Sequence, residues 1–207
     1  SATFVIVVVD EEYPLILDVP SGITVSNDTG LCGATVTWIT PTAEDNCKID
    51  TFDSSHASGD FFTVGTTEVT YIAADIHGNE TSAIFVIVVV DEEYPLILDV
   101  PSDIGVSNDT GLCGASVTWG QVDTTDNCSV LVFEETHTSG MFFPVGTTPV
   151  TFASTDTSGN RTLASFDITV VDEEDPVLVD VPQNITSSTD IGQCDAVVSW
   201  TDPSAQD

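Results

Sequence analysis

The chain has 207 residues, and 34 aspartate and glutamate residues face only two lysine and arginine residues, which gives a formal net charge of −32. Because phosphate binding needs cationic side chains, this balance excludes nucleic acid as a partner and disfavours insertion at an anionic membrane surface. Hydrophobic residues make up 41% of the chain and follow strand-like patterns, so the acidity is not that of a disordered tail. We expect it to supply solubility, repulsion between neighbours and attraction for cations.

One string of residues recurs and sets the organisation of the chain. Residues 4–14 and 85–95 are identical, and residues 166–176 are a close copy: an apolar β-branched run, three acids and a proline. Equivalent residues are 81 positions apart throughout, a length that suits one small sandwich domain per repeat. We therefore predict four parts of a longer protein. They are the last strand and linker of a preceding repeat at 1–12, complete repeats at 13–93 and 94–174, and the start of a third repeat at 175–207.

The first complete repeat contains short apolar stretches separated by turn residues, with no helical periodicity. We expect Pro41–Asn46 and Ser54–Asp60 to be loops, Asp75–Asn79 to be a tight connection, and Trp38 to lie in the core. The strands expected in chain order are 15–17, 23–25, 34–38, 49–52, 61–64, 69–73 and 83–90. Short strands with turns at regular intervals predict an all-β fold, a tandem array of immunoglobulin-like β-sandwiches.

Each complete repeat contains two cysteines 15 positions apart, and the fifth cysteine, Cys194, has its expected partner two residues beyond Asp207. A thiol pair in each repeat favours a disulfide and an oxidising compartment. Zinc is the alternative, but the chain has no C-x-x-C motif and no histidine at ligand spacing. The predicted pairs are Cys32 with Cys47 and Cys113 with Cys128.

Several motifs occur in a fixed order: Gly30-Leu31-Cys32-Gly33-Ala34, Asp45-Asn46-Cys47, Phe62-Thr63-Val64-Gly65-Thr66-Thr67 and Asp156-Thr157-Ser158-Gly159-Asn160. The chain strongly resembles the hyalin repeat family over its whole length. The resemblance implies an immunoglobulin-like sandwich from extracellular proteins tied to adhesion, including the sea-urchin hyaline layer and giant bacterial surface adhesins. It also implies a second cysteine pair, but Val19 and Ala83 stand there in the first repeat.

Acidic and amide side chains are expected to gather where successive sandwiches meet. The last strand of one repeat leads into a linker, and two loops of the next repeat face that linker. Crowded carboxylates repel one another unless they are neutralised, and Ca²⁺ accepts six to eight oxygen ligands in irregular loops. The sequence therefore predicts a Ca²⁺ site at each junction, although no loop has an EF-hand pattern. The candidate ligands are Asp10, Glu11, Glu12, Asp28, Asp45, Asp75, Asn79, Asp91, Glu92, Glu93, Asp126, Asp156 and Asn160.

The alternative interpretation of these acids is a hydrated linker that only keeps the repeats apart. No G-x-S-x-G motif or nucleophile–base spacing occurs, and His77 is matched by Ser158 in the next repeat, so we expect no enzyme activity. N-glycosylation motifs include Asn79 and Asn160, where the sugar and the proposed calcium role exclude each other.

We expect a stalk or filament of a secreted or cell-surface protein, by resemblance a giant adhesin of a gliding or marine bacterium. Its partners would be neighbouring repeats, surface glycans or other adhesin chains, with no membrane insertion of this segment. The second hypothesis is a binding module for glycan or protein, which predicts an exposed aromatic patch in each repeat. Phe61 with Phe62 and Phe142 with Phe143 are the candidates, one of each pair being core.

Overall fold

The computed structural model describes residues 2–207 and is all-β. Among these residues there is no helix that is long and apolar enough to cross a membrane. The first repeat consists of β1 (Leu15–Leu17), β2 (Ile23–Ser26), β3 (Gly33–Thr35), β4 (Thr42–Glu44), β5 (Ile49–Ser54), β6 (Phe61–Thr63), β7 (Gly65–Asp75) and β8 (Glu80–Val90).

The second repeat has the same strands in the same order. They are β9 (Leu96–Leu98), β10 (Ile104–Ser107), β11 (Gly114–Ser116), β12 (Asp123–Thr125), β13 (Val130–Glu135), β14 (Phe142–Pro144), β15 (Gly146–Asp156) and β16 (Arg161–Val171). After the second repeat, β17 (Val177–Val179) pairs with β18 (Ser204–Gln206) in the register in which β1 pairs with β4, and the assignment of residues 175–207 to a third repeat stays a prediction. The 81-residue period in sequence is therefore also a period in structure.

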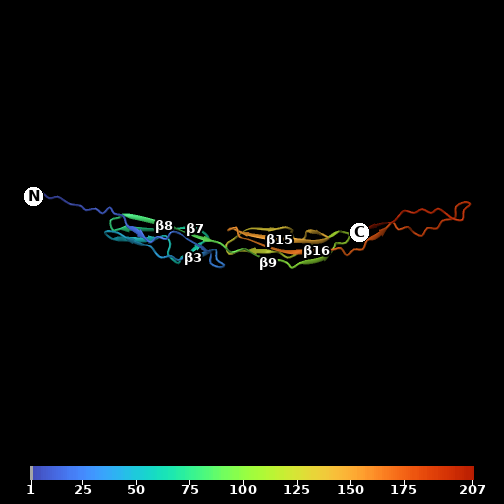
Figure 1. The fold of residues 1–207 in the computed structure, drawn as a ribbon, viewed down its shortest axis with the longest axis horizontal. Helices are drawn as coiled ribbons and strands as arrows, with labels where there is room; N and C mark the ends of the chain where they lie inside the picture. The colour runs from blue at the N-terminus through green and yellow to red at the C-terminus, as the bar shows by residue number, and fades with distance from the viewer. Residues whose placement is uncertain (1) are drawn as a thin grey trace. The chain divides into compact units, whose positions relative to one another are not determined.

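Each repeat is built on a four-stranded sheet, in the order β2-β8-β7-β5 in the first repeat and β10-β16-β15-β13 in the second. The long strands β7 and β8 run side by side (Figure 1) and pair antiparallel. In their register Val69 lies opposite Phe85. β2 adds to the edge in parallel with β8. The pairs β1–β4 and β3–β6 complete the sandwich. The predicted fold class is confirmed.

The core of the first repeat lies between the long strands and the β3–β6 pair. Alternate residues of β7 and β8 point inward because side chains of a strand alternate between its faces. Trp38 packs edge-on against Phe85, with ring centroids 5.4 Å apart, and its Nε1 donates a 2.8 Å hydrogen bond to the Tyr71 hydroxyl. The buried cluster contains Ala34, Val36, Phe62, Val69, Tyr71, Phe85, Ile87 and Val89.

Most predicted strands differ from the structure at their ends: the strand expected at 69–73 is β7, Gly65–Asp75, and the strand expected at 83–90 begins at Glu80. Two other differences depend on the partner strand. Residues 42–44, expected within a loop, form β4 because their backbone pairs with β1, which polar side chains do not prevent. The strand expected at 34–38 ends at Thr35, since its pairing with β6 spans only Gly33–Thr35. In both cases the partner strand, not the side-chain pattern, sets the boundary.

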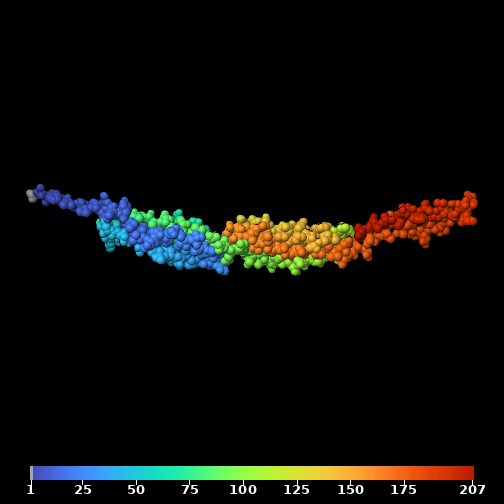
Figure 2. Space-filling view, in the orientation of Figure 1, coloured from blue at the N-terminus to red at the C-terminus, as the bar shows by residue number. Residues whose placement is uncertain are grey.

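The N-terminal copy of the recurring string shows what a strand needs. Phe85 in β8 is 3% exposed, whereas the identical Phe4 is 84% exposed and residues 2–12 form no strand. In Figure 2 the dark-blue N-terminal end of the chain extends away from the first repeat. An apolar β-branched run becomes a strand only beside a partner that accepts its backbone hydrogen bonds. The assignment of residues 1–12 to a preceding repeat stays a prediction.

The chain divides into two compact units whose boundary does not follow the sequence repeat. The first unit contains Ser1–Leu98 together with Asp123–Glu134 and Ala153–Leu163, and the second contains Asp99–Val122, Glu135–Phe152 and Ala164–Asp207. Two loops of the second repeat therefore belong with the whole of the first. The contacts described next lie inside that first unit.

Candidate functional site at the joint between repeats

A disulfide links the two repeats. It joins Cys32, which precedes β3 in the first repeat, to Cys128, which precedes β13 in the second, across 96 residues of sequence. Cys47, Cys113 and Cys194 are free and exposed. We call the surroundings of this bond the joint: the turn Asn27–Cys32, the linker Asp91–Glu93, and the loops Asp126–Cys128 and Asp156–Asn160.

The predicted pairing of Cys32 with Cys47, and of Cys113 with Cys128, is wrong. The turn before Cys32 lies at the end of β8, where the Gly30 amide donates a 2.7 Å hydrogen bond to Glu93. Cys47 lies at the opposite end of β8, beside Asp10 and His77. An 11-residue strand is about 33 Å long, whereas a disulfide requires Cα atoms within about 7 Å. The two cysteines of one repeat therefore cannot meet.

Asp91 is the centre of the joint and is only 4% exposed. Its Oδ1 accepts hydrogen bonds from the Asn127 amide group at 3.3 Å and the Glu93 backbone amide at 3.2 Å. Its Oδ2 accepts one from the Ser158 hydroxyl at 3.2 Å, and its carbonyl accepts one from Asn160 Nδ2 at 3.1 Å. One linker residue is thus held by both loops of the second repeat.

The other side of the joint is the turn Asn27–Cys32. Asn127 Nδ2 also donates to the Leu31 carbonyl at 3.1 Å, beside the disulfide. Glu93 Oε1 accepts from the Asn27 side chain as well as from Gly30, and Glu92 accepts a 2.7 Å hydrogen bond from Ser26. The two glutamates therefore hold the turn Asn27–Cys32 of the first repeat in place. That turn contacts the second repeat through Asn127.

Two oxygen atoms in the joint are buried and have no hydrogen-bond partner among the described residues: Asp126 Oδ1 and Asn127 Oδ1. Asp126 Oδ2 accepts a 2.9 Å hydrogen bond from the Cys128 amide, which orients the carboxylate. A carboxylate oxygen of Asp91, one of Asp126 and the disulfide sulfur of Cys128 lie within 4.8 Å of one another, so the two carboxylates are close enough to share a cation. Burying polar oxygens without partners costs free energy, and a hard cation bound by oxygen would relieve that cost.

The D-x-x-G-N loops have a structural role of their own. Asp156 Oδ1 accepts from the Ser158 and Asn160 amides, and its Oδ2 accepts from Asn160 Nδ2, all at 2.8 Å. Asp75 makes the same bonds to His77 and Asn79. Burial raises the pKa of Asp75, but hydrogen bonds led by those from Asn79 lower it by more, so the net shift is downward. These aspartates close their own loops.

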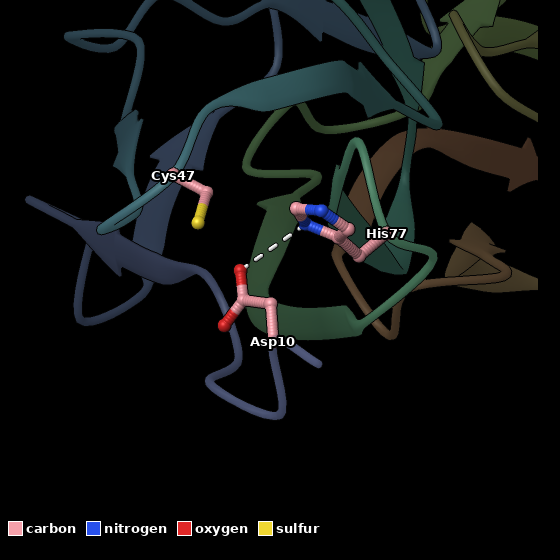
Figure 3. A group of neighbouring side chains, drawn as sticks. All are labelled: Asp10, Cys47 and His77. Atoms are coloured by element: carbon pink, nitrogen blue, oxygen red, sulfur yellow. Dashed lines mark ion pairs between the residues drawn. The ribbon is translucent and has the colours of Figure 1, made fainter. Parts of the chain in front are cut away.

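The first repeat has an equivalent end, which we call its pole, around Asp10, and there Cys47 forms no disulfide. Cys47 and His77 face Asp10, and His77 Nδ1 lies 3.3 Å from Asp10 Oδ2 (Figure 3). Hydrogen bonding to Asp10, then burial and the charges of Asp10, Asp45 and Asp75, raise the pKa of the Cys47 thiol to about 11. Hydrogen bonds led by that from Cys47 lower the pKa of Asp10. Asp10, Asp45 and Asp75 also gather within 4.8 Å.

The structure therefore separates the predicted metal ligands into groups. It brings together Asp91 with Asp126, and Asp10 with Asp45 and Asp75. It uses the carboxylates of Asp28, Glu92 and Glu93 to hold the turns, Asp28 Oδ2 accepting from the Thr35 amide at 2.9 Å. Glu11 and Glu12 are exposed. Asn27 and Ser158 were missed by sequence reasoning, and the repetition of Asn27 at Asn108 is the signal that could have identified it.

The repeats that form this joint are similar to known proteins. The HYR domain matches residues 9–89 and again 90–170. The chain belongs to the HYR domain family. Hyalin of Lytechinus variegatus is 35% identical over 183 residues, covering 86% of this chain and 34% of that protein. Hyalin of Strongylocentrotus purpuratus is 31% identical and covers 99% of this chain and 18% of that protein.

A second kind of relative is much longer. A sushi, von Willebrand factor type A, EGF and pentraxin domain-containing protein of Rattus norvegicus is 33% identical over 78% of this chain, which matches 4% of its length. Among solved structures, a protocadherin gammaB7 fragment aligns over 84% of this chain and 55% of its own with 14% identity and a TM-score of 0.38. The chain thus spans about a third or less of the curated relatives it matches.

Proposed function

We propose that this chain is a structural and adhesive segment of a long extracellular surface protein, in which successive sandwiches are stapled together as a stalk or filament. The observation that carries the proposal is the Cys32–Cys128 disulfide between repeats. A bond between repeats transmits tension from one repeat to the next, and such bonds persist in oxidising compartments outside the cytosol. Membership of the HYR family, with hyalin among the relatives, supports the same role.

The proposal includes Ca²⁺ as a second element of the joint. Asp126 Oδ1 and Asn127 Oδ1 are buried without partners beside Asp91, and all three supply the oxygen that Ca²⁺ prefers. A net charge of −32 favours cation binding throughout. When bound, the ion would offset carboxylate repulsion and restrict motion of the linker. The sequence boundaries 13–93 and 94–174 for the repeats are part of this proposal.

A melting experiment tests the calcium element. At Ca²⁺ concentrations about a hundredfold above the dissociation constant, binding stabilises the folded state by about 2.7 kcal/mol, so a chelator should lower the melting temperature of the oxidised chain. Asp126→Asn should reduce this chelator-sensitive shift. Asp53→Asn removes an equal charge from the exposed face of β5 and should leave the shift unchanged. If neither Ca²⁺ nor the chelator changes the melting temperature, the calcium element is overturned.

One observation favours a second candidate function, a binding module for glycan or protein. Phe62 and Phe143 are buried, while their neighbours Phe61 and Phe142 are each 50% exposed. Each exposed ring covers a glycine, Gly33 or Gly114, where a Cβ would overlap it. Each repeat therefore presents a half-exposed phenylalanine ring at the same position. Glycan-array binding that is lost in the Phe61→Ser/Phe142→Ser double variant would support this function over a purely mechanical one.

A further inference from the structure

The two cysteines of the disulfide are each repeated at a position that is free. Cys128 corresponds to Cys47 one period earlier, and Cys32 corresponds to Cys113 one period later. Both free cysteines are exposed. The chain therefore carries one complete joint and, on either side of it, one half of the same joint.

The half around Cys47 is already formed in the first repeat. Asn46 Nδ2 donates to Asp10 Oδ1 at 3.4 Å, as Asn127 does to Asp91 at 3.3 Å. Asn79 Nδ2 donates to the Asp10 carbonyl at 3.3 Å, where Asn160 donates to Asp91 at 3.1 Å. The Cys47 amide donates to Asp45 at 2.9 Å, the same distance as between Cys128 and Asp126.

The half around Cys113 is formed in the second repeat. Asn108 Nδ2 donates to the Leu112 carbonyl at 3.1 Å, the same distance as from Asn27 to Leu31. The Gly111 amide donates to Glu174 at 2.8 Å, and Ser107 donates to Glu173 at 2.7 Å. The Leu112 carbonyl is thus placed as the Leu31 carbonyl is placed to accept Asn127. Because these groups are already oriented, docking costs little additional ordering.

We propose that Cys47 and Cys113 are the two binding halves of a self-propagating joint, each of which receives another copy of this HYR repeat and is sealed by a disulfide. Cys47 takes the turn cysteine of the copy before it, and Cys113 takes the loop cysteine of the copy after it. In an array the bonds then run from each repeat to the next. This inference rests on the proposed function, because it extends the observed disulfide between repeats to the repeats on either side. It requires neither Ca²⁺ nor an adhesive ligand.

Formation of each disulfide is an oxidation, and the oxidant is a small-molecule disulfide such as oxidised glutathione. One thiolate attacks the glutathione disulfide, forms a mixed disulfide and releases one glutathione. The second cysteine of the joint then attacks the protein sulfur of that mixed disulfide and releases the other glutathione. Two protein thiols thus become one disulfide, and one oxidised glutathione becomes two reduced molecules. Docking places the second thiol beside the first, so the correct pair is favoured by proximity.

The chain itself permits a digest that separates bonds within repeats from bonds between repeats. Lys48 and Arg161 are its two basic residues, so trypsin yields the fragments 1–48, 49–161 and 162–207. Cys32 and Cys47 lie in the first fragment, and Cys113 and Cys128 lie in the second. With thiols blocked before denaturation, the observed bond links these two fragments without reductant. Bonds within repeats would leave all three fragments separate, which would overturn the joint itself.

The decisive experiment extends the full chain in register. A copy of residues 13–81 is fused before Ser1 and a copy of residues 127–174 after Asp207, because Ser1 and Asp207 are equivalent to Ser82 and Asp126. The protein is refolded in a glutathione buffer, its thiols are blocked, and it is digested with trypsin. We expect three joint disulfides, two free thiols among eight cysteines, and four tryptic fragments joined as one species.

Bonds within repeats would give the opposite pattern: four disulfides, no free thiol and no linked fragments. Cys113→Ser should release only the last cysteine-containing fragment, and Cys47→Ser only the first, which assigns each half separately. If Cys47 and Cys113 remain alkylatable in the extended protein, the inference is overturned. The calcium melting test does not depend on this map, so failure of one leaves the other standing.

Discussion

The pole of the first repeat around Asp10 and the pole of the second repeat around Asp91 have nearly the same residues and different neighbours. Around Asp91, the turn Asn27–Cys32 supplies a carbonyl to Asn127 and a disulfide partner to Cys128. Around Asp10, the equivalent cysteine is a thiol facing a carboxylate and His77. The hydrogen bonds within each pole are alike, so the pole is a property of one repeat. Its covalent chemistry depends on the neighbour.

The largest expected effect comes from removing the covalent bond. Cys32→Ser should destabilise the oxidised chain by about 3 kcal/mol, since a disulfide that spans 96 residues restricts the unfolded chain strongly. Differential scanning calorimetry should show a melting temperature lower by roughly 10 °C. Cys47→Ser is the matched control at the free pole and should leave the melting temperature unchanged. Equal effects of the two variants would contradict the pairing.

The next effect concerns the carboxylate at the centre of each pole. Asp91→Ala should cost about 2 kcal/mol, because the side chains of Asn127 and Ser158 lose a buried charged acceptor. Asp10→Ala should cost less than half of that, since no neighbouring repeat is held through it. Chemical denaturation of the oxidised variants measures both. A larger loss for Asp10→Ala would show that the pole, not the joint, carries the stability.

The next prediction concerns the rate at which the free thiol at the first pole, Cys47, reacts; its counterpart Cys128 is in the disulfide. The pKa of Cys47 is raised to about 11, so at pH 8 nearly all of it is the unreactive thiol. We expect iodoacetamide to modify Cys47 roughly ten times more slowly than a freely exposed cysteine. Asp10→Asn should speed this reaction by removing the carboxylate that holds the proton. Peptide mapping over time gives the rates, and equal rates before and after Asp10→Asn would refute the assigned cause.

The smallest expected effect comes from the side-chain amide of Asn160, which links the loop Asp156–Asn160 to the linker Asp91–Glu93. Asn160→Ala removes hydrogen bonds to the Asp91 carbonyl and to Asp156, and should cost about 1.5 kcal/mol. Asn79→Ala removes the equivalent bonds at the free pole, where the bond to Asp10 is longer, 3.3 Å, and should cost about 1 kcal/mol. Calorimetry of both variants resolves the order. The reverse order would mean that the longer contact is the stronger one.

Much of the site was predictable because it repeats. The sequence pattern placed the linker Asp91–Glu93 beside the loops at 126–128 and 156–160, and the hydrogen bonds of Asp91 to Asn127 and Ser158 confirm that arrangement. The direction of each side chain was not predictable. Glu93 turns back to accept a 2.7 Å hydrogen bond from the Gly30 amide, and Asp156 accepts a 2.8 Å hydrogen bond from the Asn160 amide of its own loop. Both directions depend on backbone amides whose positions only the folded chain fixes.

By itself the sequence determined the 81-residue unit, the all-β sandwich, the HYR family and the gathering of acids between repeats, since periodic patterning and turn residues act locally. Only the tertiary structure decided which cysteines meet. In a periodic sequence, a partner 15 residues away and one 96 residues away are the same kind of residue, so spacing cannot tell them apart. The length of β8 separates the two cysteines of one repeat and leaves the neighbouring repeat as the partner within reach.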